Sequence, residues 1–145
     1  MNRDEAKPLT PFERDVLDWI LRGDDPVRVA LRQQLIAASV SRRQFTGVGF
    51  FVDFAVPESV SRLDTLLGTE PDFELGDVGV IFEDPNVEVG LVLFVRGGRI
   101  NMFEGYTYGD ETWPEPQGRY RLFYFAERET PGGGGPEKGP DAVGS

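Results

Sequence analysis

The sequence predicts a single α+β domain, in which an N-terminal helix pair packs on a mostly antiparallel sheet of about five strands. Apolar residues recur at helical spacing through roughly the first forty residues and then alternate at strand spacing. The 145 residues, of which 39% are hydrophobic, are enough for one domain with a sizeable core. We expect this domain at 10–128, between a frayed lead at 1–9 and a disordered, Gly- and Pro-rich tail at 129–145.

The first helix is expected to begin at Thr10. This residue can cap the helix, Pro11 suits the first helical position, and Glu13 completes a capping box. Gly23 ends the helix, and the same cap-then-proline pattern starts a second one at Asp25. Because only about three residues connect the two helices, they should form an αα-hairpin.

Within 46–56, apolar residues recur at every second position without a break, which predicts a strand: Val48, Phe50, Val52, Phe54 and Val56. We expect one long, bent strand here, and a hairpin that turns at 47–49 is the alternative. Gly47 and Gly49 fall opposite the apolar stripe, where they mark a bend or a place at which another backbone or ring packs closely. Asp53 also falls on that side, next to Phe51.

The rest of the chain predicts further strands. Residues 57–76 form a connection, with a short helical turn within 59–67. Strands follow at 77–83, 89–96, 99–104 and 119–126, with a turn at Asp84-Pro85-Asn86 and a two-residue hairpin turn at Gly97-Gly98.

The Gly97-Gly98 turn also predicts the register of its hairpin, because directly opposed residues share a face of the sheet. Both faces are largely apolar, so one should pack on the helices and the other needs a second cover. The loop after the hairpin is the candidate cover. One face carries Val95 opposite Ile100 and Leu93 opposite Met102, with Glu104 opposite Leu91 at its edge, and the other face carries Val92, Phe94, Asn101 and Phe103.

The composition excludes several classes of site. The chain has no Cys and no His, so it has no disulfide, no thiol chemistry, no His-dependent nucleophilic triad and no zinc site built from those ligands. Carboxylate, Lys, Tyr or Arg chemistry remains open. We expect neither a cofactor nor a bound metal.

The formal charge of −10 is concentrated in residues 68–128, where twelve Asp and Glu against five Arg leave −7. Such a surface repels nucleic acid and anionic membranes and attracts a basic partner. No apolar run is long enough to cross a bilayer, and the opening MNRDEAKPLT has no apolar signal-peptide region. We therefore expect a cytoplasmic protein.

The loop after the hairpin is rich in rings and acids, with no Lys or Arg between Met102 and Gly118. Its rings either fold over a sheet face as a cover or stand at the rim of a surface that recognises a basic segment, and the two roles are compatible. The four acids of the stretch, among them Glu115, should face solvent around partly buried rings. The candidate binding residues are Glu104, Tyr106, Tyr108, Asp110, Glu111 and Trp113.

Two patterns suggest a small-molecule site instead. Asp53 and Glu104 lie on strands and form a candidate acid/base pair, as in glycoside hydrolysis. Arg96 and Arg99 flank two glycines in the manner of a phosphate cradle, but the hairpin turn explains those glycines. The sequence contains no P-loop, no GxGxxG unit and no EF-hand loop.

The strings LTPFE (9–13), FTGVGFFVDF (45–54), LFVRGGRINMFEGYTYG (93–109) and TWPE (112–115) resemble a widespread family of small, uncharacterised bacterial cytosolic proteins. The resemblance extends over about 9–125. It implies a compact cytosolic domain and brings no activity, cofactor or catalytic residue with it.

Together these features predict a non-catalytic acidic binding domain, of the size and charge of an inhibitor or immunity-type partner of a basic protein. The alternative is a small-molecule-binding protein or carboxylate-based enzyme with a pocket near Asp53 and Glu104.

Overall fold

The computed structural model describes residues 7–83, 86–114 and 118–129. It confirms the α+β class and the N-terminal helix pair, with six strands instead of about five. Residues 1–6 of the expected lead, Asp84 and Pro85 of the expected turn, and 130–145 of the expected tail lie outside the described residues. The elements are α1 (Pro11–Ile20), α2 (Pro26–Ala37), β1 (Ser39–Phe45), β2 (Gly49–Ala55), α3 (Leu63–Leu67), β3 (Phe73–Glu83), β4 (Asn86–Arg96), β5 (Arg99–Thr107), β6 (Tyr120–Tyr124) and α4 (Phe125–Glu129).

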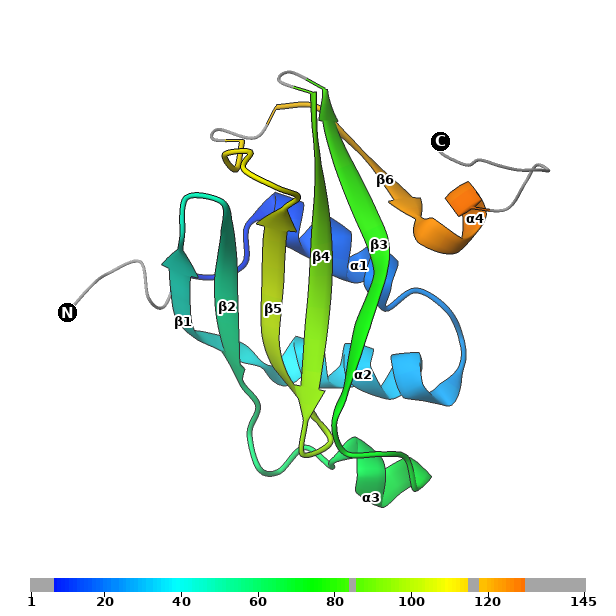
Figure 1. The fold of residues 1–145 in the computed structure, drawn as a ribbon. Helices are drawn as coiled ribbons and strands as arrows, with labels where there is room; N and C mark the ends of the chain where they lie inside the picture. Colours follow the sequence, from blue (N-terminus) through cyan, green and yellow to red (C-terminus); the bar gives the residue numbers. More distant parts are fainter. Residues whose placement is uncertain (1–6, 84–85, 115–117, 130–145) are drawn as a thin grey trace.

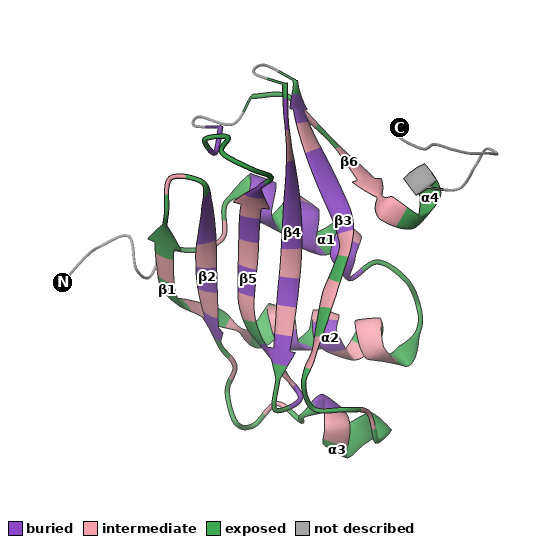
Figure 2. Cartoon of the chain, in the orientation of Figure 1, coloured by how far each residue is buried: buried purple, intermediate pink, exposed green. Residues whose placement is uncertain are grey.

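The six strands form one antiparallel sheet in the order β1-β2-β5-β4-β3-β6. Helices α1 and α2 lie on one face of this sheet (Figure 1) and enclose the core with it. No helix of the described ranges crosses the opposite face, which we call the open face. Buried and partly exposed residues alternate along the central strands (Figure 2). The open face carries Phe51, Asp53, Ile81, Glu88, Val92, Phe94, Met102, Glu104, Tyr106 and Phe123.

Helix α1 begins as expected and is tied to the sheet at its first turn. The hydroxyl of Thr10 accepts from the amide of Glu13 at 3.1 Å, and the amide of Thr10 donates to Oε1 of Glu13 at 2.9 Å. Arg43 of β1 donates to both carboxylate oxygens of Glu13, at 2.8 and 3.0 Å. The buried Glu13 therefore caps the helix and links it to the edge of the sheet.

The expected long strand at 46–56 is wrong, and the hairpin alternative is correct. Strands β1 and β2 pair side by side around a turn at 46–48. Gly47 has φ of 91°, a conformation that favours glycine, and the amide of Thr46 donates to the carbonyl of Gly49 at 2.9 Å. The apolar series from Val48 to Val56 does not reveal this turn, because it lies in β2 and the residues that flank it, and its first member, Val48, is an exposed residue of the turn.

The expected register of the Gly97-Gly98 hairpin holds only for its first two pairs. Arg96 lies opposite Arg99 and Val95 opposite Ile100, but Phe94 then lies opposite Met102. One residue of β5, Asn101, is therefore extra, which makes a β-bulge. A shift of one residue exchanges the two faces of a strand. Met102 and Glu104 consequently lie on the open face and Phe103 in the core, the reverse of the expected arrangement.

Helix α2 is held to the same hairpin by one buried amide side chain. Gln34 is 1% exposed, and its Nε2 donates to the carbonyl of Gly98 while its Oε1 accepts from the amide of Ile100, both at 2.9 Å. These bonds satisfy both ends of the buried amide. None of the helices in the described part of the chain is long and apolar enough to cross a membrane.

Candidate functional site

Trp113 closes the core and is not part of the surface. Its side chain is 2% exposed, and its ring lies on the helix side of the sheet, 5.1 Å from the ring of Phe50 and 5.8 Å from that of Phe82. Its amide donates to the carbonyl of Gly47 at 3.0 Å, which ties the loop to the β1–β2 turn. The expectation that this ring is partly exposed is wrong, and the loop covers the core face with it rather than the open face.

Tyr106 and Tyr108 share one side of the chain, as the spacing of two residues predicts. Their rings meet edge to face with centroids 5.6 Å apart. Thr107 points the other way, is buried, and donates its hydroxyl to the carbonyl of Glu111 at 2.6 Å. Tyr106 is half-buried on the open face, and Tyr108 is 42% exposed at its end. Asp110 and Glu111 are exposed beside them, and Glu115 lies outside the described residues.

Glu104 is an acid surrounded by apolar side chains on the open face. Phe51 lies opposite it on β2, and Val92 lies opposite it on β4. Along its own strand, Met102 and Tyr106 are its nearest neighbours on the same face. Partial burial among these groups raises the pKa of the Glu104 carboxyl. Its carboxylate has no hydrogen-bond or ion-pair partner among the residues the structure describes.

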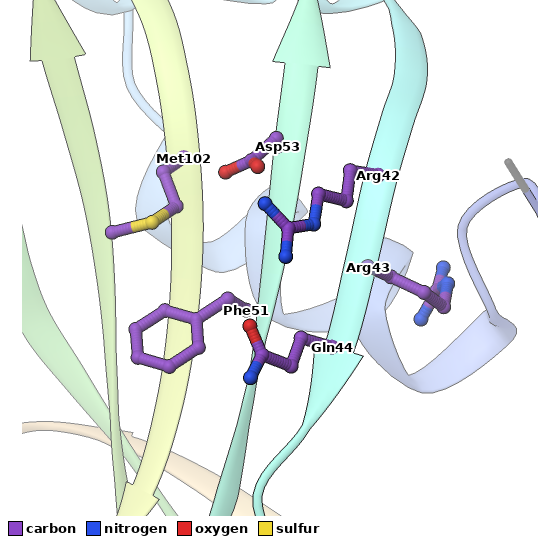
Figure 3. Close-up of a pocket in the computed structure, with 6 residues that line it drawn as sticks. All are labelled: Arg42, Arg43, Gln44, Phe51, Asp53 and Met102. Atoms are coloured by element: carbon purple, nitrogen blue, oxygen red, sulfur yellow. The ribbon is translucent and has the colours of Figure 1, made fainter. Parts of the chain in front are cut away.

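A shallow cavity of about 250 Å³ lies beside Glu104, between β1, β2 and β5. Arg42 and Asp53 face each other across β1 and β2, and Arg42 extends over β2 towards the ring of Phe51 (Figure 3). Arg43 points away from the cavity, towards Glu13 (Figure 3). The lining residues are Arg42, Arg43, Gln44, Phe51, Asp53 and Met102.

Apart from Arg43, which pairs with Glu13, the polar side chains that line this cavity have no partner among the described residues. Within the described ranges, Arg42, Gln44 and Asp53 form no side-chain hydrogen bond and no ion pair, although Arg42 and Asp53 are cross-strand neighbours. Gly47 and Gly49 do not line this cavity. The alternative pocket near Asp53 thus corresponds to a real cavity, with Glu104 one position beyond its rim.

On the open face beyond Glu104, aromatic rings pack over glycines of the neighbouring strands. Gly79 and Gly90 are paired across β3 and β4. A Cβ on Gly90 would lie 2.5 Å from the Tyr106 ring, and one on Gly79 would lie 2.6 Å from the ring of Phe123. The two glycines therefore make room for rings from β5 and β6, which extend the apolar surface across the sheet. The alternation of the separate strands does not show this, because the ring and the glycine stand on different strands.

Two other site types find less support. The amides of Gly97 and Gly98, in the stretch that looks like a phosphate cradle in sequence, donate to Oδ1 of Asp72 and to the carbonyl of Pro71, each at 2.8 Å. These donors are thus taken up by the loop before β3. In the described part of the chain no three acids gather in a way that would hold a metal ion.

The residues of the open face from β1 to β5 therefore form the candidate site: apolar side chains with two acids and with Arg42, which has no side-chain partner among the described residues. No family model matches the chain, and neither the curated proteins nor the solved structures give a significant match to it.

Proposed function

We propose that this protein is a non-catalytic binding domain whose open face receives a basic side chain of a partner protein, with Glu104 as the acid that meets it. The observation that carries the proposal is the position of Glu104 among apolar side chains, with no cation paired to it in the part of the chain that the structure describes.

The apolar neighbours of Glu104 suit the stem of lysine or arginine. Such side chains pack their methylene groups on apolar surface and keep the charged end at a polar group. Phe51, Val92 and Met102 provide the apolar surface, and the ring of Tyr106 adds a face that attracts cations. A cation at Glu104 would also offset the cost of holding its charge among these groups.

The charge of the whole chain favours the same partner. The formal charge is −10, and Asp110 and Glu111 add exposed acids at the end of the open face. These acids would raise the rate of encounter with a basic protein more than the strength of the final complex. An inhibitory or immunity-type role in the cytoplasm fits this size and charge by analogy and belongs to the same proposal.

The second candidate is a small-molecule site, favoured by the cavity between Arg42, Asp53 and Met102. Asp53 and Glu104 are diagonal neighbours across β2 and β5, since Asp53 lies opposite Met102 and Phe51 opposite Glu104. Diagonal positions are about 7–8 Å apart. This arrangement is suited to holding a molecule with two cationic groups.

The proposal is tested with a fluorescein-labelled peptide of alternating lysine and valine, amidated at its C-terminus, and a matched peptide of glutamate and valine. We expect fluorescence anisotropy to rise with the basic peptide alone. Glu104→Gln should weaken its binding at least fivefold, the effect of losing one charge-assisted contact. Glu70→Gln is the matched control, because Glu70 is an exposed acid in the loop before β3. If the two variants lose the same amount of peptide affinity, binding depends only on the net charge of the protein and not on Glu104. Absence of binding would refute the proposal.

A further inference from the structure

The cavity and Glu104 together present one cation and two anions at fixed positions. This pattern is more specific than the binding of a basic partner protein requires. We propose that they form a binding site for a free basic α-amino acid, lysine or arginine, with the α-carboxylate at Arg42, the α-ammonium at Asp53 and the side-chain cation at Glu104. This inference shares Glu104 with the proposed function but does not need a partner protein.

The pairing of Arg42 with Asp53 carries the first step. They are directly opposite on β1 and β2, where side-chain Cβ atoms are about 5 Å apart, and both reach the open face. Neither has a side-chain partner in the described part of the chain. An α-amino acid carries its own opposite charges on one carbon atom, so its carboxylate can meet Arg42 while its ammonium meets Asp53. The exposed amide of Gln44, also unpaired within the described residues, lies beside Arg42 and adds a donor for the carboxylate.

The arrangement of β2 and β5 carries the second step. Four residues make a square on the open face, in which Asp53 lies opposite Met102 and Phe51 lies opposite Glu104. One diagonal joins the two acids over about 7–8 Å, and the other diagonal is formed by the apolar side chains of Phe51 and Met102. A ligand stem that runs from Asp53 to Glu104 therefore passes between an aromatic ring and a thioether. The methylene stems of lysine and arginine span a distance of this order.

The balance of charges carries the third step. The site offers one cation and two anions, and a basic amino acid offers one anion and two cations. Every charged group of the site then gains a partner of opposite sign, which the fold itself does not supply within the described ranges. A neutral amino acid leaves Glu104 without a partner among apolar side chains, and unpaired charges of this kind disfavour the wrong ligand.

The test uses 15N chemical-shift titrations of the protein with L-lysine and with three analogues, each lacking one charge. Nα-acetyl-L-lysine lacks the ammonium, L-lysinamide lacks the carboxylate, and L-norleucine lacks the side-chain cation. We expect each analogue to bind about tenfold more weakly than L-lysine, as for the loss of one charge-assisted pair. The largest shifts should fall on β1, β2 and β5.

Matched variants assign each charge to its residue. Arg42→Gln should abolish the preference for L-lysine over L-lysinamide, Asp53→Asn the preference over the acetylated form, and Glu104→Gln the preference over L-norleucine. Arg14→Gln is the control, because Arg14 is exposed on α1, on the other side of the sheet.

Two results would overturn the inference. Tighter binding of L-lysinamide than of L-lysine would show simple attraction of positive charge to an acidic protein. Binding of the lysine–valine peptide without any binding of L-lysine would leave the proposed function standing and remove this site. Conversely, binding of L-lysine without binding of the peptide would support the amino-acid site and refute the protein partner.

Discussion

Tyr106 lies across Gly90 on the open face, and the absence of a side chain at residue 90 makes room for the ring. The two residues are directly opposite on β5 and β4. A Cβ at residue 90 would lie 2.5 Å from Cζ of the tyrosine and 2.6 Å from its hydroxyl oxygen. A glycine inside a strand usually weakens the strand, so its presence here is explained by the ring that covers it.

We expect Gly90→Ala to destabilise the protein by about 1–2 kcal/mol, because the added methyl group displaces the ring of Tyr106. In a Tyr106→Ala background the same change should be neutral or slightly stabilising, since alanine costs less backbone entropy than glycine. Urea denaturation of the single and double variants gives the coupling energy. Gly79→Ala is the control, because Phe123 and Phe125, not Tyr106, lie over Gly79. If Tyr106→Ala has the same coupling energy with Gly79→Ala as with Gly90→Ala, the effect does not come from the contact between Tyr106 and Gly90.

Gly47 and Gly49 should both resist replacement, but for different reasons. A Cβ on Gly49 would overlap the backbone carbonyl of Gly105, which cannot move without breaking the β2–β5 pairing. Gly47 has no atom close to the place of a Cβ, but its φ of 91° is strained for other residues. We expect Gly49→Val to cost more than about 2 kcal/mol and Gly47→Val about 1 kcal/mol. Thermal denaturation in the presence of urea checks the order, and a neutral Gly49→Val would rule out the close approach.

Glu104 should lower stability near neutral pH and strengthen ligand binding. Its pKa is raised in the folded protein, so the unfolded chain loses its proton first as pH rises. The free energy of unfolding therefore falls as pH rises from the ordinary glutamate pKa through the raised one. Glu104→Gln should stabilise the protein at about pH 7 and have little effect at about pH 3.5. Denaturation curves of both proteins at the two pH values measure this. Destabilisation by Glu104→Gln at neutral pH would mean that the fold uses the charge.

The helices were predictable because local chemistry determines them. Thr10, Glu13 and Asp25 cap their helices through side-chain bonds to residues only three positions away, so the signal is contained in a short stretch of sequence. The placement of Asp53 beside Phe51, away from the buried stripe, followed from strand alternation in the same way. Neither the helix caps nor the alternation along one strand depends on which strand lies alongside.

The site was only partly predictable, because its residues meet across strands. The sequence predicts Asp53 and Glu104 as a candidate pair, but the bulge at Asn101 decides that Glu104 points to the same open face as Asp53. Sequence gives no sign of that bulge, since both alternatives present an apolar face to the core. No local pattern in the sequence marks Arg42 as a site residue. Its role depends on the β1–β2 turn, which places it opposite Asp53, and the apolar series that begins at Val48 gives no sign of that turn.

The loop after β5 contains one buried ring, that of Trp113, and two exposed acids, Asp110 and Glu111, and substitutions of the two kinds should have different effects. Trp113 is 2% exposed, and its ring contacts those of Phe12, Phe50 and Phe82. Trp113→Ala should cost about 3–5 kcal/mol, because it leaves a large cavity at the end of the core. Asp110 and Glu111 are exposed, so changing both to Ser should alter stability by less than about 1 kcal/mol.

The same double change distinguishes two roles for the loop acids. If they steer a basic partner, the lysine–valine peptide should associate more slowly with the double variant at low salt, and the difference should shrink as salt screens the charges. Stopped-flow anisotropy measures these rates, and Trp19→Phe serves as a control away from the loop, since Trp19 stacks on Tyr124 at the other side of the domain. Unchanged association rates at low salt would show that the loop serves the core through Trp113 alone, and that recognition is confined to the open face around Glu104.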